Sequence, residues 1–117
     1  MALQIVEKDS GGVTVLELSG RIVLGGESSQ LRNKIKEILE KGKTRLLIDL
    51  ANVGQIDSAG LGTLVSGYTS AQSVGATLKL ASLTKRFREQ LSITKLVTVF
   101  EVFDTTEEAL KSFGPTT

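Results

Sequence analysis

The sequence predicts an α/β fold: a mixed β-sheet, made of an N-terminal hairpin and parallel strands, with about four packed helices. Two observations lead to this fold class. Short β-branched runs alternate along the chain with segments whose apolar residues recur at helical spacing, and strands separated by helices normally pair in parallel through right-handed crossovers. The 117 residues contain no internal Pro- or Ser-rich break, so we expect one domain over residues 1–117 with an ordered core at about 3–113.

The N-terminal part of the chain predicts a β-hairpin. Two short β-branched runs, residues 3–8 and 13–19, are separated by Asp9-Ser10-Gly11-Gly12, whose glycines tolerate the positive φ of a tight turn. We expect a loop over Gly20–Gly26 after the second strand.

A helix and a central strand are predicted next. One apolar stripe at helical spacing marks the helix, which we expect to be capped by Ser28 or Ser29 and to end at Gly42. The stripe consists of Leu31, Ile35, Ile38 and Leu39. The nearly continuous apolar run over residues 46–50, around Asp49, is typical of a central strand covered on both faces.

Two more helices, two strands and a final helix complete the predicted fold. In chain order they are a helix from after Asp57 to Gly75, a strand over 76–83, a short helix over 85–91 with Phe87 and Leu91 inward, a strand over 97–103 and the final helix with Ala109, Leu110 and Phe113 inward. The final helix has a start signal, because Thr105 followed three residues later by Glu108 matches a capping box. Pro115 should end it.

The composition excludes several classes of function. Fourteen basic and 13 acidic residues leave a formal net charge of +1, too little to attract a polyanion, so we expect no direct nucleic-acid binding. The chain has no Cys and no His, which removes the thiolate nucleophile and the commonest general base and metal ligand. Its aspartates lack the spacing of a metal-binding loop. We therefore predict no metal, no cofactor and no catalytic residue.

The N-terminal residues also bear on where the protein works. Glu7, Lys8 and Asp9 stand where a signal peptide would need an apolar run. Nowhere do eighteen apolar residues follow one another. We expect a cytoplasmic protein without membrane insertion.

The most unusual segment is Ile56–Gly62, where a strand gives way to a helix. Ser58 should lie at or beside the N-cap, and its hydroxyl can accept an orphan backbone N–H there. The same location suits a phosphate group, because unpaired amides and the positive end of the helix dipole stabilise an anion. A phosphoserine would bring a charge of about −1.5 to −2 into a spot that a partner must desolvate. Asp57 beside it would add like-charge repulsion.

Two glycines in this segment need an explanation. Gly60 and Gly62 fall within the first helical turn or so, where each costs roughly 1 kcal/mol against Ala. One explanation is that a partner's backbone must come close, with Leu61 as an apolar contact. The other is that the glycines let the helix pack tightly on its own sheet. The spacing alone leaves both open.

Three stretches of the sequence carry a resemblance to a known family: LIDLANVGQIDSAGLG over residues 47–62, GATLKL at 75–80 and FDTTEEAL at 103–110. Together with the hairpin before them, they resemble the STAS domain, the fold of bacterial anti-sigma factor antagonists, with residues 47–62 similar to its signature. In that family the serine after the aspartate of the signature is phosphorylated, and the matching position is Ser58. The resemblance implies a STAS-like mixed sheet and a regulatory binding module that is not an enzyme.

The resemblance also implies a set of partners. The unmodified form would bind an anti-sigma factor that is also a serine protein kinase and so release a sigma factor. Phosphorylation would end this binding, and a PP2C-type phosphatase would restore it. The loop after the second strand, Gly20–Glu27, departs from the Leu-Asp and Asn-Ala pairs of many antagonists, which affects the identity of the partner. The predicted partner-binding residues are Arg21, Leu24, Asp57, Ser58, Ala59, Gly60, Leu61 and Gly62.

Two other functions stay open at this point. The chain could be a constitutive STAS scaffold or accessory subunit of a larger assembly, such as a stress-signalling complex or a lipid transporter. It could also be a nucleotide-binding protein that uses the crevice near Ser58, although it contains no G-x-x-x-x-G-K-[ST] phosphate loop.

Serine catalysis and phosphate binding by the basic cluster are less favoured. The nucleophile-elbow pattern G-x-S-x-G requires Gly where Ile56 stands, and no His is available as a base. The basic cluster of Lys85, Arg86 and Arg88 is expected to be the solvated face of a short helix.

Overall fold

A five-stranded sheet organises this computed structural model, which describes residues 3–23, 25–85, 87–89 and 100–114. The strands are β1 (Gln4–Ser10), β2 (Val13–Ile22), β3 (Arg45–Ile56), β4 (Thr77–Ala81) and β5 (Val102–Phe103), and they follow one another across the sheet in chain order. The first pair is antiparallel and each later pair is parallel. The predicted hairpin and mixed sheet are therefore confirmed.

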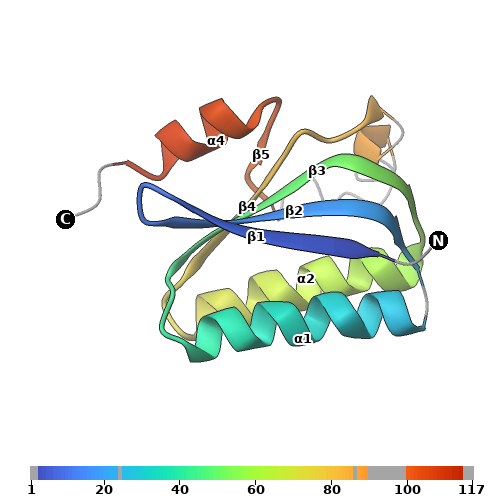
Figure 1. The fold of residues 1–117 in the computed structure, drawn as a ribbon, viewed down its shortest axis with the longest axis horizontal. Coiled ribbons are helices and arrows are strands. Elements are labelled where there is room, and N and C mark those ends of the chain that lie inside the picture. The colour runs from blue at the N-terminus through green and yellow to red at the C-terminus, as the bar shows by residue number, and fades with distance from the viewer. Residues whose placement is uncertain (1–2, 24, 86, 90–99, 115–117) are drawn as a thin grey trace.

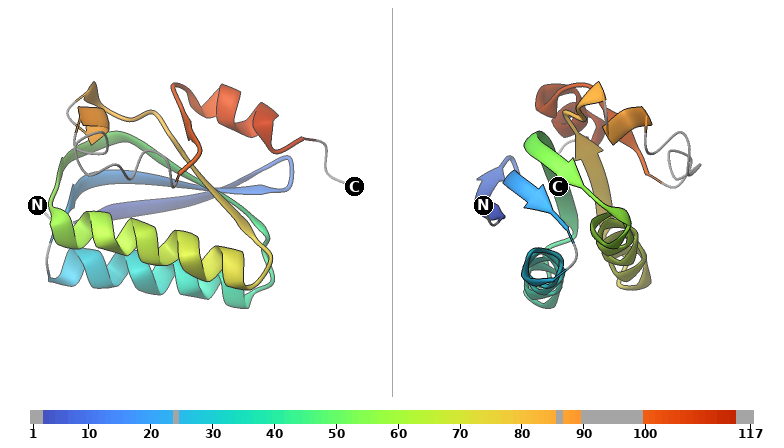
Figure 2. Two further views of the ribbon diagram at one scale, coloured as in Figure 1. Left: turned by 180° about the vertical axis from the view of Figure 1, so that it is seen from behind. Right: turned by 90° about the vertical axis from the view of Figure 1, so that its right-hand side faces the viewer.

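Helices cover both faces of this sheet. The helix α1 (Gly26–Glu40) and the helix α2 (Ser58–Ser73) lie side by side on one face, and α4 (Thr106–Ser112) lies on the other (Figure 1). Lys85 and residues 87–89 are also helical. The right-hand view of Figure 2 shows α1 and α2 nearly end-on beneath the sheet. Helix α1 follows the end of β2, and α2 follows the end of β3. Because β2 and β3 are parallel, the N-termini of both helices lie at the end of the sheet where these two strands end.

The core has one large and one small part. The large cluster lies between the sheet and the pair α1 and α2, and the small cluster lies beneath α4. Strand β3 contributes to both, because Leu46 and Ile48 belong to the first cluster while Leu47 belongs to the second, and all three are fully buried. The predicted central strand with two covered faces is confirmed.

Two predicted boundaries near α1 differ from those in the structure. Strand β2 continues to Ile22, so the loop predicted from Gly20 is wrong for its first three residues. The predicted cap is also wrong: α1 begins at Gly26, its N-cap residue Gly25 provides no side-chain cap, and the Ser28 hydroxyl donates to the Val23 carbonyl at 2.7 Å. The helix begins before the serines, so they fall inside its first turn.

Strand β3 extends beyond the predicted range of residues 46–50, and its additional part is irregular. Its pairing with β2 shifts twice, so that Glu17 and Ser19 face Asp49 and Asn52, and Gly20 and Arg21 face Val53 and Gln55. Each shift gives β3 one extra residue, which is the definition of a β-bulge. The buried positions Leu50, Val53 and Ile56 consequently recur at every third residue.

The C-terminal elements agree with the prediction where they are described. The predicted helix start at Thr105 is confirmed, because Glu108 N donates to Thr105 Oγ1 at 3.1 Å. The capping box is only half formed, since Glu108 Oε1 accepts from the Thr105 hydroxyl at 3.2 Å and not from the Thr105 backbone N–H. Phe87 is buried as predicted. The predicted strand over 76–83 is shorter, since β4 is Thr77–Ala81. Leu91, residues 97–99 and Pro115 lie outside the described residues. In the described part of the chain, no helix is both long and apolar enough to cross a membrane.

A buried lysine holds α4 on the sheet. Lys79 of β4 is 6% exposed, and its Nζ donates to Ser112 Oγ at 2.9 Å and to the Ser112 carbonyl at 3.2 Å. The same ammonium pairs with Glu101 at 3.3 Å and lies 4.6 Å from the centroid of the Phe113 ring. A cation at the C-terminal end of a helix is favoured by the helix dipole, so Lys79 stabilises the position of α4.

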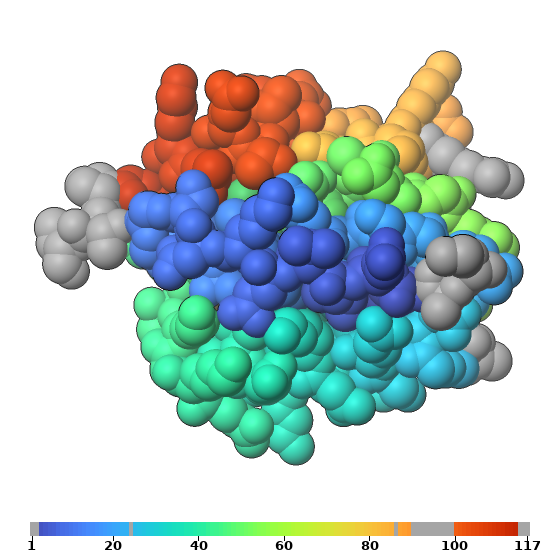
Figure 3. All heavy atoms as spheres, viewed as in Figure 1, coloured from blue at the N-terminus to red at the C-terminus, as the bar shows by residue number. Residues whose placement is uncertain are grey.

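An ion-pair network joins β1 to α1, which lie against each other in the space-filling view (Figure 3). Lys34 Nζ lies 2.7 Å from Glu7 Oε1 and 3.2 Å from Glu37, and Lys43 lies 3.7 Å from Glu7. The hydrogen bond from Lys34 lowers the pKa of Glu7 below its ordinary value of 4.5, with further lowering by the charges of Lys34, Lys43 and Lys41 against the opposing effect of burial.

We expect Glu7→Gln to destabilise the fold by about 0.5–1 kcal/mol at neutral pH. A carboxyl whose pKa is depressed by folding contributes stability above its unfolded pKa and loses it as the pH falls through the folded pKa. The difference from wild type should therefore shrink below pH 4.5 and vanish once Glu7 is protonated. Urea titrations followed by circular dichroism at several pH values measure it. Glu17→Gln in the more exposed Lys8–Glu17 pair is the control and should cost less.

Candidate functional site

The candidate site is the start of α2, where Asp57 alone separates the last residue of β3 from the first residue of the helix. Asp57 has an extended backbone, and its Oδ1 accepts a hydrogen bond from Gly60 N at 2.8 Å. Its carbonyl accepts from Leu61 N at 2.9 Å, and its own N–H donates to the Ile22 carbonyl at 3.3 Å. Asp57 is thus the N-cap of α2 and also extends the pairing of β2 with β3.

Ser58 occupies the first helical position, directly after this cap, and is exposed. The prediction that it lies at or beside the N-cap is confirmed. Capping is done by Asp57, so the Ser58 hydroxyl is not needed for it, and we find no hydrogen bond from that hydroxyl to a described residue. A phosphate group added to this oxygen would lie at the positive end of the helix dipole of α2, which stabilises a negative charge.

The two glycines of the first turns have different environments. A Cβ atom on Gly60 would overlap the carbonyl oxygen of Ile22, whereas a Cβ on Gly62 would meet nothing within 4 Å. Gly60 is buried and Gly62 is exposed. The tight-packing explanation therefore applies to Gly60, while packing among the described residues gives no reason for glycine at position 62.

The other predicted binding residues divide between the core and the surface. Leu61 is 8% exposed and belongs to the large core cluster, so it does not offer the apolar surface contact that we expected. Ala59 is half-buried. Arg21 is exposed at the end of β2, at the same sheet edge, and lies 4.0 Å from Glu27 in the first turn of α1. Leu24 lies outside the described residues.

The charged side chains of the described residues form neither a metal-binding group nor a free basic cluster near this site. The described residues contain no group of three or more acidic side chains that could hold a metal ion. The basic cluster is partly neutralised, because Arg88 pairs with Asp104 at 2.7 Å. Lys85 is exposed, and Arg86 lies outside the described residues. What the site offers is an exposed hydroxyl on a rigid helix start.

Sequence reasoning missed the capping role of Asp57. The signal was available, because Asp is among the best N-cap residues and directly precedes the helical segment. Its carboxylate fixes the first turn of α2 and therefore the position of Ser58.

Comparison with known proteins shows the family to which this chain belongs. A family model of the STAS domain matches residues 4–109. A Thermotoga neapolitana relative, which carries the provisional name of anti-sigma factor antagonist, is 40% identical over 75 residues, or 64% of this chain and 66% of the relative. The chain belongs to the STAS domain family.

Solved structures agree with this assignment. A Thermotoga maritima protein, also named provisionally as an anti-sigma factor antagonist, superposes with a TM-score of 0.86 at 26% identity over 92% of both chains. The Bacillus anti-sigma factor antagonist SpoIIAA has been solved unphosphorylated and phosphorylated. The unphosphorylated structure gives a TM-score of 0.71 at 20% identity over 96% of both chains. The phosphorylated structure gives 0.73 at 21% over 96% of this chain and 99% of its own. At these identities the likeness to SpoIIAA shows the fold.

Proposed function

We propose that this protein is an anti-sigma factor antagonist that switches partners through phosphorylation of Ser58, and that it is a binding module without catalytic activity. The observation that carries the proposal is the exposed Ser58 at the first position of α2, in a fold whose relatives are named anti-sigma factor antagonists. SpoIIAA, which shares the fold, exists in an unphosphorylated and a phosphorylated form.

In this proposal the unmodified protein binds an anti-sigma factor that is also a serine protein kinase, and a sigma factor is released. The kinase phosphorylates Ser58, and a PP2C-type phosphatase reverses the modification. Since sigma factors act on the transcription machinery, the proposed place of action is the cytoplasm. The chain itself is the substrate in both reactions.

The docking surface that we propose is the outer face of α2 near its start. Ser58, Gly62, Ser66 and Ser70 are spaced four residues apart, so they lie on one helix face, and all four are exposed. A face of glycine and serine lets a partner's backbone approach closely. The proposed surface also includes Arg21, which is exposed near the end of β2. Gly60 and Leu61 shape it from beneath, because both are buried.

The electrostatic argument explains how the switch would operate without unfolding the protein. A phosphate on Ser58 carries about −1.5 to −2 charge and is stabilised by the amides and dipole at the N-terminus of α2. A docked partner would have to remove water from this charge, which lies beside the half-buried, negatively charged Asp57. The fold tolerates the phosphate while the interface does not.

The experiment that tests the proposal is phosphorylation by the cognate kinase. The full chain is incubated with the kinase and ATP, and the modified residue is identified by mass spectrometry. We expect modification at Ser58 and none in the Ser58→Ala variant. Ser10→Ala is the control, since it removes an exposed serine of β1 that lies outside the proposed docking surface, and it should be modified like wild type. Modification only at another residue would refute the assignment.

A further inference from the structure

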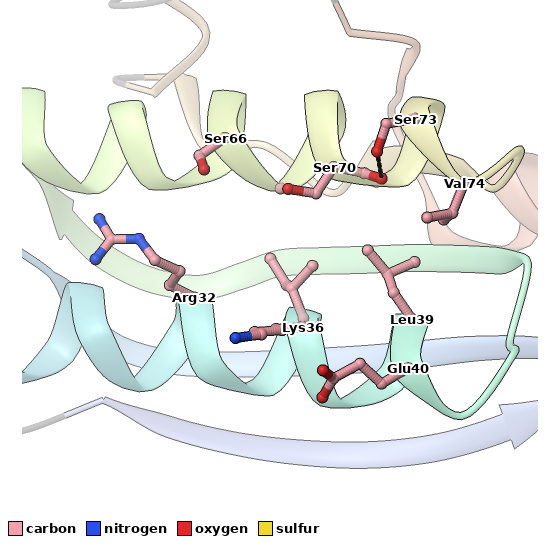
Figure 4. Close-up of a pocket in the computed structure, with 10 residues that line it drawn as sticks. Arg32, Lys36, Leu39, Glu40, Ser66, Ser70, Ser73 and Val74 are labelled. Carbon is pink, nitrogen blue, oxygen red and sulfur yellow. Dashed lines mark hydrogen bonds between the residues drawn. The ribbon is translucent and has the colours of Figure 1, made fainter.

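A groove between α1 and α2 lies outside the proposed phosphorylation site. It has a volume of about 380 Å³, which falls within the roughly 300–1,000 Å³ typical of small-molecule sites. Its floor is where the two helices touch, since a Cβ atom on Gly67 would come within 2.8 Å of Ile35 Cδ1. Figure 4 shows the side chains of both helices that form its walls.

The groove is cationic at one end and apolar at the other. Arg32 and Lys36 direct their charged groups to the end that Ser66 borders, while Leu39 and Val74 point toward each other at the opposite end (Figure 4). Val74 is 60% exposed and is one of two large apolar side chains exposed among the described residues. Leu39 follows Arg32 by seven positions, which is about 10 Å along the helix.

The two cations of the groove are available for a ligand. Arg32 and Lys36 form no ion pair with another described residue, whereas Lys34 on the same helix and Lys41 directly after it pair with Glu37. Glu40 also lines the groove, but its carboxylate forms no ion pair with Arg32 or Lys36. An anionic group at this end of the groove would therefore find two donors that no carboxylate of the described residues already pairs.

We propose that this groove binds a free single-chain amphiphile with an anionic head group, such as a medium-chain fatty acid. The head group lies between Arg32 and Lys36, and the alkyl chain runs over Ile35 and Gly67 toward Leu39 and Val74. A second copy of the chain fits less well, because two-fold pairing across the groove would place the cationic end of one copy either on the apolar end or on the cationic end of the other. The volume suits one chain rather than a two-chain bilayer lipid.

The test is an NMR titration of the isotope-labelled full chain with decanoate, below the concentration at which decanoate forms micelles. We expect saturable binding, roughly millimolar or tighter, with amide shifts confined to α1 and α2 around Ile35, Gly67 and Val74. Decyltrimethylammonium has the same chain and a cationic head, and it should bind roughly tenfold more weakly or less.

Two double variants test whether Arg32 and Lys36 bind the head group of the amphiphile. Arg32→Gln with Lys36→Gln should weaken decanoate binding by roughly tenfold or more, since charge-assisted hydrogen bonds are lost. Lys85→Gln with Lys111→Gln removes two charges from exposed residues outside the groove and should leave the affinity unchanged. Val74→Asp, which places a carboxylate at the apolar end, is an independent variant that should also weaken binding.

Three results would overturn the proposal. They are the absence of saturable decanoate binding, equal binding of the cationic amphiphile, and equal loss in both pairs of charge variants. Sedimentation with phosphatidylglycerol vesicles separates a free amphiphile from a membrane lipid. Vesicle binding that requires Arg32 and Lys36, without binding of decanoate, would contradict a free ligand.

Discussion

Ser58→Asp is expected to abolish tight binding of the anti-sigma factor while leaving the protein folded. The aspartate stands at the first position of α2, where the helix dipole favours a negative charge by about 0.3–1 kcal/mol, so the free energy of unfolding should change little. An unpaired carboxylate in a desolvated interface costs several kcal/mol, which corresponds to a roughly 100-fold or greater loss of affinity. Isothermal titration calorimetry against the kinase measures the loss.

Ser58→Ala is the matched variant for this experiment. It removes the phosphorylation site without adding charge, so the affinity should stay within about threefold of wild type, as for a surface change without a polar partner. In the presence of ATP the wild type should lose binding over time and Ser58→Ala should not. Equal affinity of the Asp and Ala variants would show that charge at residue 58 is not the signal and would favour a constitutive scaffold.

The elements that could be predicted best have a regular period. The apolar stripe of α1, with Leu31 and Ile35, recurs at helical spacing and is buried, and the capping box at Thr105 marks the start of α4. The bounds that were wrong have local causes that no period reveals. The second half of β3 was missed because its bulges give a spacing of three between Leu50, Val53 and Ile56, which matches neither a regular strand nor a helix.

Contacts between residues that are distant in the sequence explain the other structural features that could not be predicted. The sequence places Lys79 in an apolar strand, but only the fold brings Ser112 and Glu101 to its ammonium. Asp49 interrupts an apolar run, and in the structure its Oδ1 accepts from Ala51 N at 3.0 Å and its Oδ2 accepts from the Thr106 hydroxyl at 3.4 Å. The groove between α1 and α2 likewise depends on how the two helices pack.

At the candidate site, too, the features set by neighbouring residues could be predicted, and those set by distant residues could not. The position of Ser58 beside an N-cap could be predicted because capping is a local property of consecutive residues. The separate roles of Gly60 and Gly62 could not, because they depend on Ile22 of the neighbouring strand β2. Burial of Leu61 follows from the same packing, since it lies on the side of α2 that faces the sheet.

Gly60→Ala is expected to destabilise the fold by about 2 kcal/mol or more, because the added methyl group would overlap the backbone carbonyl of Ile22. That carbonyl is part of β2 and accepts the hydrogen bond from Asp57 N, so it cannot move without disturbing the cap beneath Ser58. Circular dichroism during urea denaturation measures the change, since the chain contains no Trp for fluorescence.

Gly62→Ala provides the control, because it makes the same chemical change two residues later in open space. Alanine has the higher helix propensity, so this variant should be more stable than wild type by up to about 1 kcal/mol. Both substitutions gain the same propensity, and the difference between them therefore isolates the contact with Ile22. Equal stability of the two variants would contradict the close approach of α2 to β2.

If Gly62 is selected by a docking partner, Gly62→Arg should fold normally and still lose affinity for that partner, which separates the binding role of Gly62 from the packing role of Gly60.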